Sequence, residues 1–189
     1  MRITGGHDRG RVLTGPQNDE VRPTSDRARL AVFNMLLARN LIQDAVVIDA
    51  FCGTGALGLE ALSRGAAQVL FIDTNHTAIT LAQTNAALLK RTPQCQFLSA
   101  DAAHLGPRAP TQIPANLLFL DPPYHQNLVL PCLMALTTGH WLDETGATLM
   151  IETERNADPI WPPSFKLITQ KTHGAATLHL LTWSSHDSH

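Results

Sequence analysis

The sequence predicts an α/β fold built on one doubly wound, mostly parallel sheet with one antiparallel strand. Three observations lead to this prediction. At residues 46–62 a short apolar run, a glycine-rich turn and a helical stretch follow one another, as in the first half of a βαβ unit. Further strand-like runs then alternate with helical stretches along the chain. Two extended runs close the chain with only a few residues between them, so we expect them to pair antiparallel.

Length and composition indicate a single domain of ordinary type. The chain has 189 residues, a hydrophobic share of 44% and a formal net charge of -2, which gives nucleic-acid binding no general support. The three cysteines lack metal-binding spacing, and the nine histidines form no HxxxH or HxH set. No apolar run is long enough to span a bilayer. We therefore expect a cytoplasmic, metal-free protein with reduced thiols.

The N-terminal stretch differs in composition from the rest of the chain. Six of the fourteen basic residues, all arginines, lie within the first thirty positions. Glycines interrupt the short apolar pieces 2–4 and 11–13, which predicts a small β-hairpin outside the main core. We divide the chain into this arginine-bearing extension, residues 1–24, and a main domain, residues 25–189. Arginine suits bidentate phosphate contacts, although a merely solvated surface is the alternative because nearby acids offset most of the charge.

The main domain shows the expected elements in order. Thr24 or Ser25 can cap a helix whose apolar stripe reaches about residue 37. The helix after the glycine turn is expected to end at Gly65, which suits a C-cap. The other predicted elements are strands at 46–48, 68–72, 95–98, 116–120 and 147–151, helices at 78–89 and 127–136, and the closing runs 165–169 and 176–183.

The turn after the first strand has the spacing of a nucleotide-binding loop. It reads Gly53-x-Gly55-x-x-Gly58, and Asp73 follows twenty residues after Gly53. Such a turn brings backbone N–H groups and a helix N-terminus up to a ligand. The spacing alone favours a nicotinamide or flavin enzyme. Asp49, at the end of the strand, favours S-adenosylmethionine instead, because a carboxylate suits a cationic amino group better than a pyrophosphate.

Four acidic residues mark the ends of successive predicted strands. They are Asp49, Asp73, Asp101 and Asp121. Any one of them could be a turn-forming or helix-capping aspartate. In an open sheet of this kind, however, ligands bind outside the carboxyl ends of the strands. Four acids in register therefore predict a ligand site at this edge.

These motifs resemble those of a known family. The run DAFCGTGALGLEALSRGA, the acids at 73 and 101, and DPPY at 121–124 resemble class I S-adenosylmethionine-dependent methyltransferases. DPPY is similar to the motif of enzymes that methylate exocyclic amines of bases. More narrowly, RITGG, RGR, VRPTSDRARLAVFNML and GALGLEALSRGA resemble the bacterial 16S ribosomal RNA guanine-N2 methyltransferases. The resemblance implies a seven-stranded Rossmann-like sheet with its last strand inserted antiparallel.

The resemblance also implies a cofactor, a substrate and roles for individual residues. S-adenosylmethionine would be the methyl donor, with S-adenosylhomocysteine as product, and 16S ribosomal RNA the substrate. Asp73 would accept hydrogen bonds from the ribose hydroxyls, and Asp101 would lie near the adenine. The expected cofactor-binding residues are Asp49, Phe51, Gly53, Thr54, Gly55, Gly58, Asp73, Asp101 and Ala102. The expected RNA contacts are Arg2, Arg9, Arg11, Arg22 and Thr24.

The chemistry of the motif Asp121-Pro122-Pro123-Tyr124 can be argued from its residue types. A guanine N2 amine is a poor nucleophile because its lone pair is delocalised into the ring. The Asp121 carboxylate and the Pro122 carbonyl can accept its hydrogens and steady the developing charge. Asp121 can also receive the released proton. Pro123 stiffens the loop, and Tyr124 offers a face on which an extruded base can stack.

The low net charge bears on the partners and leaves alternatives open. Because few phosphates would be neutralised, we expect a substrate that includes small-subunit ribosomal proteins, and a monomeric enzyme. An adenine-N6 methyltransferase is one alternative, since DPPY serves any exocyclic amine. The others are an NAD-dependent oxidoreductase, for which no substrate domain or general acid is apparent, and a non-catalytic RNA-binding assembly factor.

Overall fold

A computed structural model of the chain describes residues 1–15 and 26–185. Seven strands form one sheet in the order β3-β2-β1-β4-β5-β7-β6. They are β1 (Val46–Ala50), β2 (Gln68–Asp73), β3 (Cys95–Ser99), β4 (Leu117–Leu120), β5 (Ala147–Glu154), β6 (Phe165–His173) and β7 (Ala176–Trp183). The helices are α1 (Asp26–Leu37), α2 (Ala56–Ser63), α3 (His76–Leu88) and α4 (Val129–Thr138), with short 3-10 helices η1 (Thr92–Gln94) and η2 (Ala102–His104).

The sheet confirms the predicted doubly wound topology. β1 pairs in parallel with both β2 and β4, and the chain winds outward from these central strands in opposite directions. β7 is antiparallel to β5 and to β6, between which it is inserted. The predicted C-terminal hairpin and the inserted last strand are both confirmed. Ligands of such sheets bind where the strand order reverses, which here is the carboxyl end of β1 and β4.

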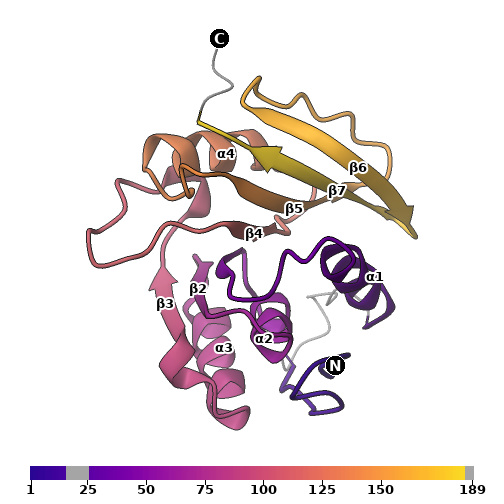
Figure 1. Cartoon of the computed structure of the whole chain (residues 1–189), viewed down its shortest axis with the longest axis vertical. Coiled ribbons are helices and arrows are strands. Elements are labelled where there is room, and N and C mark those ends of the chain that lie inside the picture. Colours follow the sequence, from indigo (N-terminus) through magenta and orange to yellow (C-terminus); the bar gives the residue numbers. More distant parts are fainter. Residues whose placement is uncertain (16–25, 186–189) are drawn as a thin grey trace.

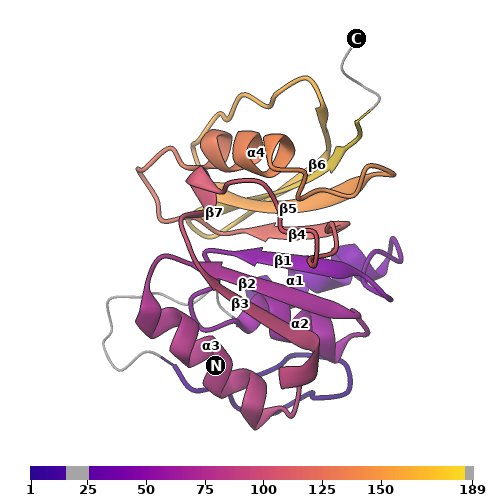
Figure 2. The same cartoon turned by 90° about the vertical axis from the view of Figure 1, so that its left-hand side faces the viewer.

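Helices cover both faces of the sheet. Figure 1 shows α1, α2 and α3 on one side and α4 on the other, and Figure 2 shows β4 and β1 next to each other in the middle of the sheet. Because side chains alternate along a strand, Val47 and Phe119 belong to the core under α1–α3. Ile48 and Leu118 belong to the core under α4. Side-chain alternation at the strand ends therefore decides which face each site residue occupies.

Several strands are longer than the sequence pattern indicated. β1 continues through Asp49 to Ala50, β2 includes Asp73, and β5 extends to Glu154. β6 extends to His173, because it and β5 both pair with β7 over almost its whole length. Ladder hydrogen bonds to a long antiparallel partner thus override the polar residues at the strand ends. The expected glycine C-cap after α2 is confirmed, with Gly65 at φ +107°.

The predicted N-terminal β-hairpin is wrong in two respects. Within residues 1–15 the structure has no strand, only an isolated antiparallel bridge between Arg2 and Val12. The segment also does not lie outside the core, because Ile3 and Leu13 are buried with relative exposures of 1% and 3% against the α1–α3 side. Two apolar anchors therefore hold this loop on the domain. The predicted capping residues of α1, Thr24 and Ser25, lie outside the described residues.

Candidate active site

Four carboxylates lie at the carboxyl ends of neighbouring strands, on one face of the sheet. They are Asp73 of β2, Asp49 of β1, Asp121 directly after β4, and Glu152 of β5. Each follows by two positions a residue of the core under α1–α3, namely Phe71, Val47, Phe119 and Met150. Residues two apart in a strand share a face, so the four acids point to the side on which the glycine turn and α2 lie.

Asp49 is the buried centre of this acidic group. Its side chain accepts a hydrogen bond of 2.8 Å from the backbone N–H of Gly58, and its relative exposure is 1%. Burial raises the pKa of Asp49 well above its usual range, the bond from Gly58 offsets part of this, and the charges of Asp121 and Asp73 raise it further. Further negative charge near Asp49 is therefore costly, and a bound cation there is favourable.

The glycine turn is held by the same acids. Asp73 accepts hydrogen bonds of 2.9 Å from the N–H groups of Gly53 and Asn75. Gly55, at φ +75°, immediately precedes α2, and Phe51 has φ +61°, which is uncommon for an aromatic residue. Strained backbone of this kind collects at ligand-binding turns. The turn therefore has the conformation that the glycine spacing predicted.

Gly58 and Thr54 fix the turn against its neighbours. A Cβ on Gly58 would lie 2.5 Å from the Phe71 ring, so only glycine lets α2 approach β2 this closely. The Thr54 carbonyl accepts a bond of 2.9 Å from the buried amide of Asn85 on α3. A Cβ on Gly53, in contrast, would meet no atom within 4 Å. The turn is therefore open beside Gly53, where a ligand can approach its backbone closely.

Asp101 stands apart from the other three predicted acids. It follows β3, two strands away from β1, and caps η2 by accepting a bond of 2.9 Å from Ala103 N–H. Its other oxygen lies 2.7 Å from His104 Nδ1, and these two interactions lower the pKa of Asp101. Ala102, beside it, is buried. The structure thus brings Asp49, Asp73 and Asp121 together and leaves Asp101 at the rim.

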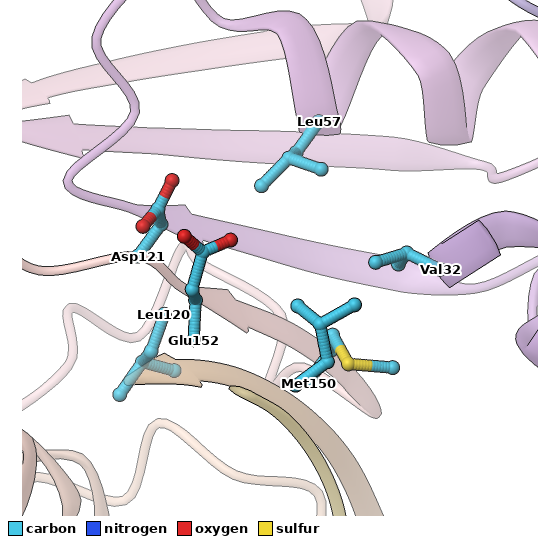
Figure 3. Close-up of a pocket in the computed structure, with 7 residues that line it drawn as sticks. Val32, Leu57, Leu120, Asp121, Met150 and Glu152 are labelled. Atoms are coloured by element: carbon cyan, nitrogen blue, oxygen red, sulfur yellow. The ribbon is translucent and has the colours of Figure 1, made fainter. Parts of the chain in front are cut away.

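Asp121, the first residue of the DPPY segment, lines a small cavity of about 10 Å³ near the start of α2. Asp121 lines this pocket with Glu152, and the apolar residues around them are Val32, Leu57, Leu120, Met150 and Leu178. Figure 3 shows the two carboxylates next to each other, both directed toward the side of the cavity on which Leu57 lies. Pro122 is buried, whereas Pro123 is exposed and Tyr124 has a relative exposure of 39%. Tyr124 is therefore partly exposed to solvent, and its stacking on a base stays a prediction.

Glu152 is the site residue that the sequence prediction missed. Tyr124 donates its hydroxyl to Glu152 Oε1 at 2.9 Å. Burial raises the pKa of Glu152 to about 7, the charge of Asp121 raises it as well, and the hydrogen bond from Tyr124 lowers it. Burial, followed by the interaction with Glu152, also raises the pKa of Tyr124. Its one sequence signal is that Glu152 directly follows the apolar run 147–151, as Asp121 follows 117–120; the continuation of the strand to Glu154 depends on pairing with β7.

Comparison with known proteins identifies the family. The family described as "Conserved hypothetical protein 95" matches residues 1–182. Ribosomal RNA small subunit methyltransferase D of Haemophilus influenzae is 32% identical over 181 residues, which cover 95% of this chain and 92% of that protein. The protein of the same name from Escherichia coli K12 is 35% identical over 181 residues, covering 95% and 88%. The chain belongs to the methyltransferase D family.

A solved structure supports the same grouping. The yhhF protein of Escherichia coli superimposes with a TM-score of 0.83 at 31% identity, covering 98% of this chain and 99% of that one. The family resemblance read from the motifs is thereby confirmed. Within residues 1–15 and 26–185 of this methyltransferase D relative, no group of three or more His, Cys, Asp or Glu could hold a metal ion. In the same residues, no helix is long and apolar enough to cross a membrane.

The N-terminal segment of this methyltransferase D relative is fastened to α2. Thr4 donates both its backbone N–H and its hydroxyl to the buried carboxylate of Glu60, each at 2.7 Å. Arg64, which directly follows α2, completes the arrangement with a salt bridge of 2.7 Å to Glu60. Farther along the segment, Asp8 pairs with Arg91 at 2.9 Å. The Thr4 contacts attach the segment to α2, whose N-terminus follows the glycine turn, and the Asp8–Arg91 pair attaches it to the connection between α3 and η1.

The arginines predicted to contact RNA are only partly free to do so. Arg2, Arg9 and Arg11 are exposed. Arg11, however, donates to the carbonyl of Leu88 at the end of α3, at 2.7 Å. Arg22 and Thr24, also predicted to contact RNA, lie outside the described residues. Among the predicted RNA contacts that the structure describes, Arg2 and Arg9 are exposed and Arg11 is engaged with α3.

Proposed function

We propose that this protein transfers a methyl group from S-adenosylmethionine to the exocyclic N2 amine of a guanine in 16S ribosomal RNA. The curated relatives are named as ribosomal RNA small subunit methyltransferases, and they match nearly the whole chain. The observation that carries the proposal is the position of Asp121 and Tyr124. Both lie at the carboxyl end of β4, beside the glycine turn that follows β1.

The acidic strand ends fit this cofactor. S-adenosylmethionine carries a cationic sulfonium and a cationic amino group, and it supplies the methyl group when bound. Asp49, Asp73 and Asp121 lie close enough for their charges to act on one another. Neutralisation by a cation relieves this repulsion, whereas the pyrophosphate of a nicotinamide cofactor would increase it. The N-terminus of α2, which follows the turn, would hold the carboxylate end of the cofactor.

Residues of the turn and of the neighbouring strand ends would bind the remainder of the cofactor. Asp49 is covered by the turn and acts on the ligand mainly by holding Gly58 and by its field. We assign Asp73 to the ribose and Asp101 with Ala102 to the adenine, in line with their order across the sheet. Phe51 and Thr54 shape the turn itself.

The DPPY segment would carry out the transfer. The Asp121 carboxylate and the Pro122 carbonyl accept the two amine hydrogens, which favours pyramidal nitrogen and stabilises the developing positive charge. Asp121 then takes the released proton, directly or through water. Pro123 stiffens the loop and Tyr124 stacks on the extruded base. Alignment of amine, methyl and sulfonium can supply on the order of 7–11 kcal/mol of the barrier.

We propose that residues 1–24 form the RNA-contacting extension of a catalytic domain spanning residues 25–189. The exposed Arg2 and Arg9 support this role. Because the formal net charge is only -2, we further propose that a monomer acts in the cytoplasm on a partly assembled small subunit, which includes ribosomal proteins. Equal turnover on protein-free transcript and on the assembled particle would argue against the second part.

Mass-spectrometric mapping of ribosomal RNA tests the proposal directly. RNA from cells that lack this protein should be missing one N2-methylguanine, and the gene should restore it. A thermal-shift panel tests the cofactor: S-adenosylmethionine at a hundred times its Kd should stabilise the protein by about 2.7 kcal/mol. Stabilisation by NAD and none by S-adenosylmethionine would refute the assignment.

A further inference from the structure

Glu152 is placed beside Asp121 by the register of the sheet. Leu120 of β4 pairs with Ile151 of β5 in a parallel ladder, so the next residue of each strand, Asp121 and Glu152, lie side by side. Both line the same pocket (Figure 3). The proposed methyl transfer uses the carboxylate of Asp121. It gives no role to the adjacent carboxylate of Glu152.

The two oxygens of Glu152 have different surroundings. Oε1 accepts the hydroxyl of Tyr124 at 2.9 Å. Oε2 accepts no hydrogen bond from the described part of the chain, so it can accept one from a ligand. Apolar side chains from α1 and α2, Val32 and Leu57, line the same pocket. They make the surroundings of Glu152 partly apolar, which strengthens a hydrogen bond to a carboxylate.

We propose that Glu152 determines specificity for guanine by accepting the ring N1–H while Asp121 accepts from the adjacent N2 amine. This inference rests on the proposed function. On its Watson–Crick edge guanine presents two neighbouring donors, N1–H and the N2 amine. Adenine presents its amine beside N1, which is an acceptor. Two adjacent carboxylates therefore complement guanine and place a lone pair against the lone pair of adenine N1.

Tyr124 links this readout to stacking. Its hydroxyl is held by Glu152, and it stands three residues after Asp121 in the same loop. A base stacked on the ring therefore lies next to Glu152, which holds the hydroxyl at the end of the ring, and Asp121 is the neighbour of Glu152 in the sheet. One residue, Glu152, thus orients the stacking surface and reads the base that lies on it.

A substrate with an altered N1 tests the readout without changing the reacting amine. After the modified position has been mapped, small subunits are reconstituted with RNA that carries guanine or 2-aminopurine there. The base 2-aminopurine keeps the N2 amine but has an acceptor at N1. The kcat/KM ratio of guanine to 2-aminopurine is then measured for the wild type, Glu152→Gln and Glu154→Gln.

The wild type is expected to prefer guanine by about 10–100-fold, the effect of an unmade buried hydrogen bond. Glu152→Gln should lower this ratio at least about tenfold, because its amide can donate to the N1 of 2-aminopurine. The glutamine oxygen can still accept from Tyr124, so the loop should keep its conformation. Glu154→Gln is the matched control: Glu154 lies two residues along the same strand face and accepts the N–H of His125 at 2.8 Å. Its ratio should equal that of the wild type.

Other outcomes overturn the inference or the function separately. An unchanged ratio in Glu152→Gln, with both rates reduced, would mean that Glu152 only positions Tyr124. A wild-type ratio near one would refute the readout without any variant, even if Glu152→Gln did not fold. A wild-type protein that methylates no guanine N2 in the particle would overturn the proposed function itself.

Discussion

Glu152→Gln is expected to stabilise the protein at pH 8 and to flatten the pH dependence of its unfolding free energy. Burial and the charge of Asp121 raise the pKa of Glu152 from its usual 4.5 to about 7. The folded protein therefore holds this proton more tightly than the unfolded chain. The contribution of this proton to the free energy of unfolding is complete below pH 4.5 and is lost as the pH rises to about 7. Glutamine has no proton to lose, so this part of the dependence disappears.

The magnitude follows from the distance between the two pKa values. Each pH unit between them is worth about 1.4 kcal/mol. Solvent screening at this partly exposed side chain reduces the whole effect to on the order of 1–3 kcal/mol. For a protein of this size, that corresponds to a change in Tm of about 2–12 °C at pH 8. At pH 4.5 Glu152 is protonated in the folded protein and half protonated in the unfolded chain, so the variant and the wild type should nearly coincide.

Thermal unfolding followed by circular dichroism between pH 4.5 and 8.5 measures the effect. Glu154→Gln removes a carboxylate from the same strand end and controls for the loss of one charge. Asp49, whose pKa is also raised by burial, is present in all three proteins, so its contribution cancels in the comparison. If Glu152→Gln were less stable than the wild type at pH 8, or had the same slope, the electrostatic account of the pocket would be wrong.

Three further variants test other parts of the site. Asp121→Asn should reduce methyl transfer about 10²–10³-fold while calorimetry shows nearly unchanged cofactor binding; full turnover would remove Asp121 from the mechanism. Gly58→Ala places a Cβ 2.5 Å from the Phe71 ring and should lower the unfolding free energy by about 1–3 kcal/mol. Gly106→Ala, whose Cβ meets nothing within 4 Å, should leave the Tm unchanged; similar shifts in both would contradict the packing argument. Arg9→Ala should weaken binding to small subunits in a filter assay and leave the Kd for cofactor intact, and equal losses would indicate a structural role.

The sequence predicted best those elements whose conformation depends on residues close together in the chain. The glycine turn requires positive φ at Gly53 and Gly55, and only a few residue types adopt it, so its signature is visible in the letters. Asp121 could be placed because an apolar strand ends where a rigid proline pair begins. Neighbouring strand ends then meet at one edge as a consequence of parallel pairing. Topology and the acidic edge therefore followed from short-range patterns.

Glu152 was missed because the end of its strand is decided by residues far along the chain. The apolar run of β5 stops at Ile151, yet the strand continues to Glu154 because β7 supplies hydrogen-bonding partners as far as Ala176. A single-sequence pattern contains no record of that partner. The acid thus became part of the sheet face rather than of a loop, and its raised pKa follows from that placement.

The N-terminal segment shows the opposite error, in which a polar composition hid a packed structure. Its arginines and glycines suggested a free hairpin, but Ile3 and Leu13 enter the core and Thr4 satisfies the buried Glu60. A buried carboxylate that loses such partners is costly, so the segment is held firmly to α2. The first turn of α2 follows Gly55 of the glycine turn. On the proposed assignments, RNA bound by the exposed arginines would therefore be positioned by the same helix as the methyl donor, so that a small extension would direct one base to the DPPY loop.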